Sequence, residues 1–168
     1  MAYIWGTRRS GLILLVNPRD YTTFWALYLW DADLAGSDDT TRSTAAWVFG
    51  IRGEAGTRFL MDVGSKSVAV TSISTPDAEL VSGALGMARS VLPLLTRLEA
   101  VTGRDVDLLA TTDNSTALHD LLTGYSKAME YLRRHHRVSV GLLSEVFGRP
   151  GHIPGKIDSS ENTPDVLT

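Results

Sequence analysis

The chain has 168 residues, a formal net charge of −3 at pH 7 and no cysteine. This length suits one domain, and 43% hydrophobic residues are enough to form a core. The absence of cysteine excludes disulfides and thiolate metal sites, the acidic balance counts against a dedicated nucleic-acid binder, and no apolar run reaches the roughly 18 residues that predict a membrane span.

The first third of the chain is predicted to be rich in strands. Short runs of apolar, aromatic and β-branched residues predict strands over residues 11–16, 23–30, 43–51 and 57–63. Glycines supply the turn between the last two runs. A short apolar piece, residues 68–73, then leads into a helix.

The clearest helix of the sequence begins near residue 75. The stretch STPD (74–77) is a helix-start signal, in which we expect Thr75 to be the capping residue. Apolar residues then recur at helical spacing for more than 20 residues. Because Pro93 lies inside this pattern, we expect a kink or break near residues 89–92, and we expect Gly103 to end the region.

The second half of the chain mixes strands and helices. A buried type of strand is predicted over residues 106–113, a short helix over 114–122, a longer helix over 126–147 and an extended piece over 151–155. Thr163-Pro164-Asp165 repeats the helix-start signal, but the sequence stops three residues later, so we expect Asp165 to be weakly anchored. The order of elements predicts one α/β domain.

Four acids fall where an α/β fold gathers its site. Asp31 and Asp113 each end a predicted strand, Glu79 lies in the first turns of the main helix, and Asp165 opens the last one. Carboxylates brought together suit Mg²⁺ or Mn²⁺, and two such ions ~4 Å apart are the standard device for in-line phosphoryl displacement. Spacing alone does not single out these four, because most of the 19 acids must be solvated surface.

Five blocks, in order along the chain, resemble one family. DADLAGSDDTTRSTAAWVF (31–49) resembles the ribonuclease H domain of copia-type LTR retrotransposon polyproteins, where "DADWAG" is followed by "RSTSGYVF". SKSVAVTSISTPDAELVSGA (65–84), TTDNSTAL (111–118) and ENTPDVLT (161–168) are similar to that family's "SKKQ…ALSSTEAEYVAL", "CDNQSAI" and "N-x-A-D-I-L-T-K". YIWGTRRSGLILL (3–15) resembles the "YLKGT…GL" tail of the preceding polymerase connection.

The resemblance implies a ribonuclease H-like α/β fold, with a mixed five-stranded sheet flanked by helices. Residues 1–20 would be the tail of the polymerase connection or an extra N-terminal strand, and residues 21–168 the ribonuclease H-like domain. The implied activity is two-metal endonucleolytic hydrolysis of the RNA strand of RNA–DNA hybrids during reverse transcription, with Mg²⁺ or Mn²⁺ as cofactor. The family's catalytic and metal-binding acids match these residues: Asp31, Glu79, Asp113 and Asp165.

The expected partners are an RNA–DNA hybrid and the reverse transcriptase portion of the same polyprotein, without a membrane. Residues expected to contact the hybrid are Asn114, Arg133, Arg134, Arg137 and Lys156. The three arginines are equally well explained as a solvated helix face. Lys156 stands where cellular ribonucleases H place a flexible histidine, so histidine-assisted product release is not carried over. The expected location is intracellular, in a cytoplasmic virus-like particle or the nucleus.

Two other functions compete with this one. The same fold could be kept as a catalytically inactive or domesticated module that binds hybrids or serves a structural role. Residues 31–36 also begin like an EF-hand calcium loop, but the fifth and twelfth loop positions hold Ala35 and Arg42, which cannot serve as the expected ligands.

Overall fold

The structure is a computed structural model that describes residues 14–34, 42–68, 72, 74–123 and 134–167. The described residues form a mixed five-stranded sheet in the order β3-β2-β1-β4-β5. β1, β2 and β3 pair antiparallel, whereas β4 pairs parallel with both β1 and β5. The strands are β1 (Trp25–Asp33), β2 (Thr44–Arg52), β3 (Arg58–Ser67), β4 (Leu108–Thr112) and β5 (His152–Lys156).

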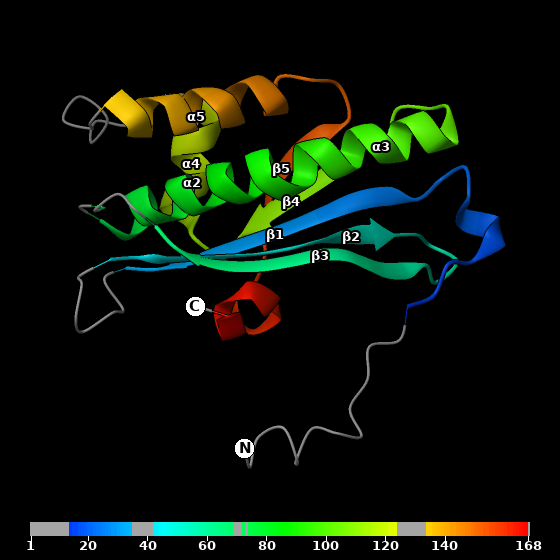
Figure 1. The fold of residues 1–168 in the computed structure, drawn as a ribbon, viewed down its shortest axis with the longest axis horizontal. Helices are drawn as coiled ribbons and strands as arrows, with labels where there is room; N and C mark the ends of the chain where they lie inside the picture. Colours follow the sequence, from blue (N-terminus) through cyan, green and yellow to red (C-terminus); the bar gives the residue numbers. More distant parts are fainter. Residues whose placement is uncertain (1–13, 35–41, 69–71, 73, 124–133, 168) are drawn as a thin grey trace, which may run out of the picture.

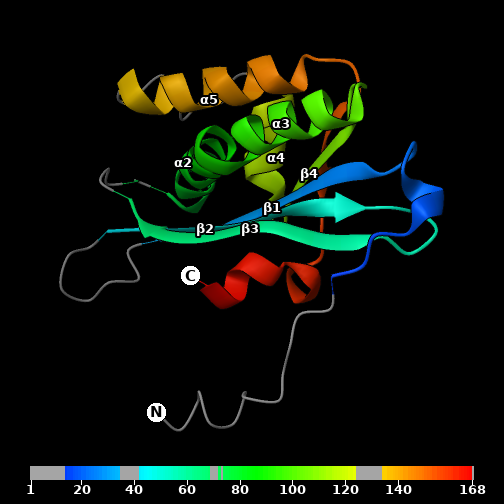
Figure 2. The same cartoon turned by 45° about the vertical axis from the view of Figure 1, so that its right-hand side comes forward.

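The longer helices lie on one face of the sheet, and a short C-terminal helix lies on the other (Figures 1 and 2). The long helical run consists of α2 (Thr75–Gly86), the π-helical turn η2 (Met87–Val91) and α3 (Leu92–Thr102). The other helices of that face are α4 (Ser115–Thr123) and α5 (Arg134–Phe147). The 3-10 helices are η1 (Pro18–Asp20), η4 (Ser159–Glu161) and η5 (Thr163–Leu167).

The predicted fold class is confirmed, and the predicted strands 23–30, 43–51, 57–63 and 106–113 correspond to β1, β2, β3 and β4. In the first predicted strand, residues 11–13 lie outside the described residues, and Leu15 forms only an isolated antiparallel bridge with Arg58. The predicted helix 126–147 is described from Arg134 onward.

The start of α2 corrects one expectation. Ser74, not Thr75, is the capping residue, since its hydroxyl accepts from the Asp77 N–H at 3.4 Å and its backbone is extended. Thr75 is the first helical residue and Pro76 the second. Ser74 and Thr75 both have side chains that can cap a helix, so the backbone conformation decides which of them does. Ser74 has the extended backbone of a capping residue, whereas Thr75 is already helical.

The irregularity expected near Pro93 takes the form of the π-helical turn η2 rather than a break. Proline has no N–H to donate to the preceding turn, and the wider π turn lets the helix continue past it. Gly103 ends α3 as predicted, with a φ of 66° and its N–H donating to Glu99 O at 2.8 Å. The run Thr75–Thr102 has the length and hydropathy of a membrane span, but 67% of its apolar window is buried inside the protein.

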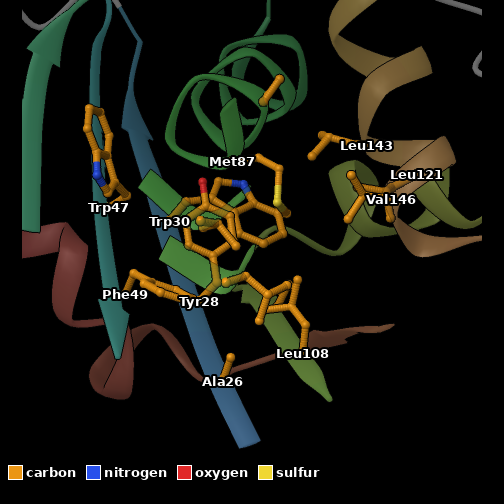
Figure 3. Packing of buried hydrophobic residues seen from close by; sticks show 14 of the residues in the cluster. Ala26, Tyr28, Trp30, Trp47, Phe49, Met87, Leu108, Leu121, Leu143 and Val146 are labelled. Carbon is orange, nitrogen blue, oxygen red and sulfur yellow. The ribbon is translucent and has the colours of Figure 1, made fainter. Parts of the chain in front are cut away.

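The core lies between the sheet and this long helical run. Figure 3 shows Tyr28 and Trp30 of β1 packed against Met87, with Phe49 of β2 beside Tyr28 and Leu143 of α5 on the other side of Met87. Tyr28 and Trp30 stack with ring centroids 5.1 Å apart, and the Tyr28 hydroxyl donates to Gly83 O at 2.8 Å. These contacts bring α2 close to β1, the strand that carries Asp31.

Gly83 is the point where α2 approaches the Trp30 ring, so an added methyl group should destabilise the fold. A Cβ at position 83 would lie 2.9 Å from the indole, which is rigid and buried. Gly83→Ala should cost about 1–3 kcal/mol of unfolding free energy in urea denaturation. The matched control is Gly141→Ala in α5, where an added Cβ would meet nothing within 4 Å. Because alanine favours the helix over glycine, this variant should raise the unfolding free energy by about 0.5–1 kcal/mol. Equal stability of the two variants would contradict this packing.

Candidate metal centre

Two neighbouring parallel strands bring Asp31 and Asp113 to the same edge of the sheet. In the β1–β4 pairing Leu29 lies opposite Thr111, and each aspartate is two residues further along its strand direction. The carboxyl ends of parallel strands meet at one edge, where α/β folds form their binding sites. Asp31 lies near the carboxyl end of β1, and Asp113 directly follows β4, so both aspartates lie at this edge.

The third carboxylate comes from α2, which crosses this edge. Glu79 lies one turn after the start of the helix and faces the sheet, where only 2% of it is exposed. Asp31 is 7% exposed, and Asp113 is partly exposed. One carboxylate oxygen from each of the three residues lies within 4.8 Å of the other two. Three acids from distant parts of the chain thus form a single cluster.

The Glu79 carboxyl has a strongly perturbed acidity. Its pKa is raised to about 9. Burial is the largest cause, followed by the nearby Asp31 and Asp113 carboxylates and a hydrogen bond with the Asp31 side chain, while a backbone hydrogen bond from Ala32 lowers the pKa. The Thr112 hydroxyl donates to Glu79 Oε2 at 3.3 Å. Without a cation the cluster therefore holds a proton on Glu79 at neutral pH.

The cluster opens into a cleft of about 470 Å³. Its lining residues are Asp31, Ala32, Asp33, Thr75, Glu79, Asp113, Asn114 and Asp165. Asp165 thus lies on the same cleft as the other three predicted acids, although it is not one of the three whose oxygens converge among the described residues.

The expectation that Asp165 is weakly anchored is wrong. The segment forms the 3-10 helix η5, and the Asp165 N–H donates to Asn162 O at 3.1 Å. Pro164 is fully buried, and Leu167 O accepts from the Ser65 hydroxyl at 2.8 Å. Burial and contacts to residues far away in the sequence hold this segment, so it does not depend on a long helix.

The residues predicted to contact a hybrid are placed unevenly. Asn114 lines the cleft, and its Oδ1 caps α4 by accepting from the N–H groups of Thr116 and Ala117 at 3.1 and 3.0 Å. Lys156 is exposed at the end of β5, opposite Thr112. Arg133 lies outside the described residues. Arg134 and Arg137 belong to α5, for which the structure describes the backbone at these two positions but not the side chains.

Several residues have roles in the site that no local sequence pattern predicts. Thr112 donates to Glu79, and the Ser82 hydroxyl donates to the Asp31 carbonyl oxygen at 2.6 Å. Thr75 lines the cleft although it does not cap α2. These roles depend on contacts between elements far apart in the chain, which local patterns do not report.

The donor set fits a hard divalent cation. The converging atoms are all carboxylate oxygens, which Mg²⁺ and Mn²⁺ prefer, and their mutual repulsion is relieved when a cation lies between them. After burial, repulsion from the Asp31 and Asp113 carboxylates is the next cause of the raised pKa of Glu79. Asp31, Glu79 and Asp113 are the residues that would hold the metal, with Asp165 beside them on the cleft.

Comparison with solved structures identifies the fold. LC11-RNase H1, isolated from compost by a metagenomic approach, matches with a TM-score of 0.59 at 14% identity over 85% of this chain and 91% of that one. Its complex with an RNA/DNA hybrid matches with a TM-score of 0.50 at 12% identity over 84% and 92%. A mutant of the Prototype Foamy Virus protease-reverse transcriptase matches with a TM-score of 0.55 at 12% identity over 89% of this chain and 19% of that one.

The chain therefore has the ribonuclease H fold, with its mixed sheet and flanking helices. No family model and no curated protein matches the sequence.

Proposed function

We propose that this protein is a metal-dependent ribonuclease H that cuts the RNA strand of RNA–DNA hybrids internally. The observation that carries the proposal is the convergence of the Asp31, Glu79 and Asp113 carboxylates in an open cleft of a ribonuclease H fold. The hybrid complex of LC11-RNase H1, which shares the fold, supports the choice of substrate. Hydrolysis would leave a 3′-hydroxyl and a 5′-phosphate.

The chain's own residues would prepare the site for this reaction. When bound, two Mg²⁺ or Mn²⁺ ions would supply water activation and stabilisation of the leaving oxygen. Asp31 is held in place by the central strand β1 and by the hydrogen bond from Ser82 to its carbonyl. Glu79 must release its proton to become a ligand, so metal binding is coupled to proton loss. RNA would be distinguished from DNA by its 2′-hydroxyl groups in the shallow minor groove.

We also propose that the protein is the ribonuclease H domain of a copia-type retrotransposon polyprotein. Five ordered sequence blocks support this origin, and the fold is shared with a viral protease-reverse transcriptase. The reverse transcriptase portion of the same polyprotein would then be its neighbour, and an intracellular virus-like particle or the nucleus its location. Asn114, on the cleft, and Lys156, at the end of β5, would contact the hybrid near the cut.

A substrate panel tests the activity. The protein is incubated with an RNA–DNA hybrid, single-stranded RNA and duplex DNA, each with Mg²⁺, Mn²⁺ or chelator. We expect cleavage of the hybrid's RNA strand alone, and only with metal. Cleavage of single-stranded RNA at an equal rate would contradict the assignment, and tight hybrid binding without cleavage in either metal would favour the inactive hybrid-binding module.

The arginines of the α5 region are proposed to contact hybrid phosphates. Replacing Arg133, Arg134 and Arg137 together by alanine should weaken binding to all sequences alike and reduce the slope of log affinity against log salt by up to about 3, one for each phosphate contact. Fluorescence anisotropy at several salt concentrations measures both quantities. An unchanged affinity and salt slope would leave these residues as a solvated helix face.

A further inference from the structure

Asn162 connects β1 to the segment that carries Asp165. It lies directly before η5 and is 2% exposed. Its side-chain amide Nδ2 donates to the Trp30 carbonyl oxygen at 3.4 Å, and Trp30 immediately precedes Asp31 in β1. Its own carbonyl oxygen accepts from the Asp165 N–H at 3.1 Å. A single buried residue therefore links the strand of the first acid to the backbone of the fourth.

The amide of Asn162 is kept at a cost. Its Oδ1 is buried and has no hydrogen-bond partner in the described part of the chain. A buried polar atom without a partner is unfavourable, so an apolar residue would serve better if the position only filled space. The Trp30 carbonyl requires a donor, which places Nδ2 rather than Oδ1 against β1. The structure therefore uses the donor at the expense of the acceptor.

We propose that Asn162 is a positioning residue that sets the placement of the Asp165 carboxylate on the cleft. This inference rests on the proposed function, because it assigns Asp165 a part in metal binding. Pro164 and the bond from Ser65 to Leu167 O hold η5 to the sheet independently. Loss of the Asn162 amide should therefore shift Asp165 relative to Asp31 without releasing the helix.

A double-mutant cycle tests the coupling. Asn162→Ala should raise the Mn²⁺ dissociation constant, measured by calorimetry, and lower kcat for hybrid cleavage by about tenfold each, as residues that orient metal ligands do. The KM for the hybrid should change by less than about twofold, because Asn162 lies outside the cleft lining. In the Asp165→Asn background the same substitution should change both quantities by less than about twofold.

Ser65→Ala is the matched control, since it removes a hydrogen bond that anchors the end of η5 to β3 and should leave metal affinity and kcat within about twofold of wild type. Asn162→Ser, whose shorter side chain cannot reach Trp30 O, replaces the alanine variant if that does not fold. Equal factors in the wild-type and Asp165→Asn backgrounds, or an equal effect of Ser65→Ala, would overturn the inference. If the wild type binds Mn²⁺ but does not cleave hybrids, the proposed function fails, and the calorimetric cycle alone decides the role of Asn162.

Discussion

Asp31→Asn should abolish cleavage of RNA–DNA hybrids while leaving the fold intact. The amide keeps the shape of the side chain but removes the charge that would hold a cation, in a cluster where the two other carboxylates lie within 4.8 Å. Residues that merely orient a metal ligand change activity by about 10–100-fold, so loss of a ligand should lower kcat by at least about a hundredfold. Single-turnover cleavage of labelled hybrid at saturating metal measures the rate.

The matched control for this substitution is Asp105→Asn. Asp105 is exposed and precedes β4, whereas the cluster lies beyond the other end of that strand. This variant should cleave at the wild-type rate, and both variants should give wild-type circular dichroism spectra. Cleavage by Asp31→Asn at the wild-type rate would indicate a contaminating nuclease and defeat the assignment.

In chelator, the protein should lose stability as the pH rises, and Glu79 should be the cause. The pKa of Glu79 is about 9 in the folded protein and near 4.5 in the unfolded chain, so between these values the folded state holds a proton that the unfolded state has released. The unfolding free energy therefore falls with rising pH across this window, by up to about 1.4 kcal/mol per pH unit. Below pH 4.5 both states are protonated and this penalty is absent.

Glu79→Gln isolates the contribution of this carboxyl. The glutamine cannot ionise, so the variant should show a flatter pH dependence and greater stability than wild type at pH 8 in chelator, as measured by urea denaturation at pH 5.5, 7 and 8.5. Added Mg²⁺ should raise the unfolding free energy of the wild-type protein at pH 8, because it binds the folded state alone. It should stabilise Glu79→Gln less, because that variant lacks one of the carboxylates. If the unfolding free energy of the two proteins depends on pH in the same way, Glu79 is not a buried, protonated carboxyl.

Local sequence patterns were sufficient to predict the elements that place the cluster. The apolar run before Asp31 and the one before Asp113 predicted two strands ending on acids, and the start signal at residues 74–77 placed Glu79 in the first turns of a helix. These predictions are confirmed because each depends on residues adjacent in the chain. That the two strands are parallel neighbours, which brings their acids together, follows only from the sheet order.

The parts that could not be predicted depend on contacts over long sequence separations. Asp165 was expected to be weakly anchored because only three residues follow it, too few for a long helix. The segment is instead held by the burial of Pro164 and by hydrogen bonds from Asn162 to β1 and from Ser65 to η5. The capping of α2 by Ser74 depended on a choice between two equivalent side chains that only the backbone conformation decides.

We expect Asp31, Glu79 and Asp113 to bind divalent cations together in the cleft. The most direct measurement is anomalous diffraction from crystals soaked in Mn²⁺ at pH 8, where a bound metal would displace the proton of Glu79. We predict anomalous peaks between these three carboxylates, with Asp165 adjacent, and their loss in Asp31→Asn. A saturating soak that leaves this cleft without an anomalous peak, or a peak that persists unchanged in Asp31→Asn, would contradict the claim.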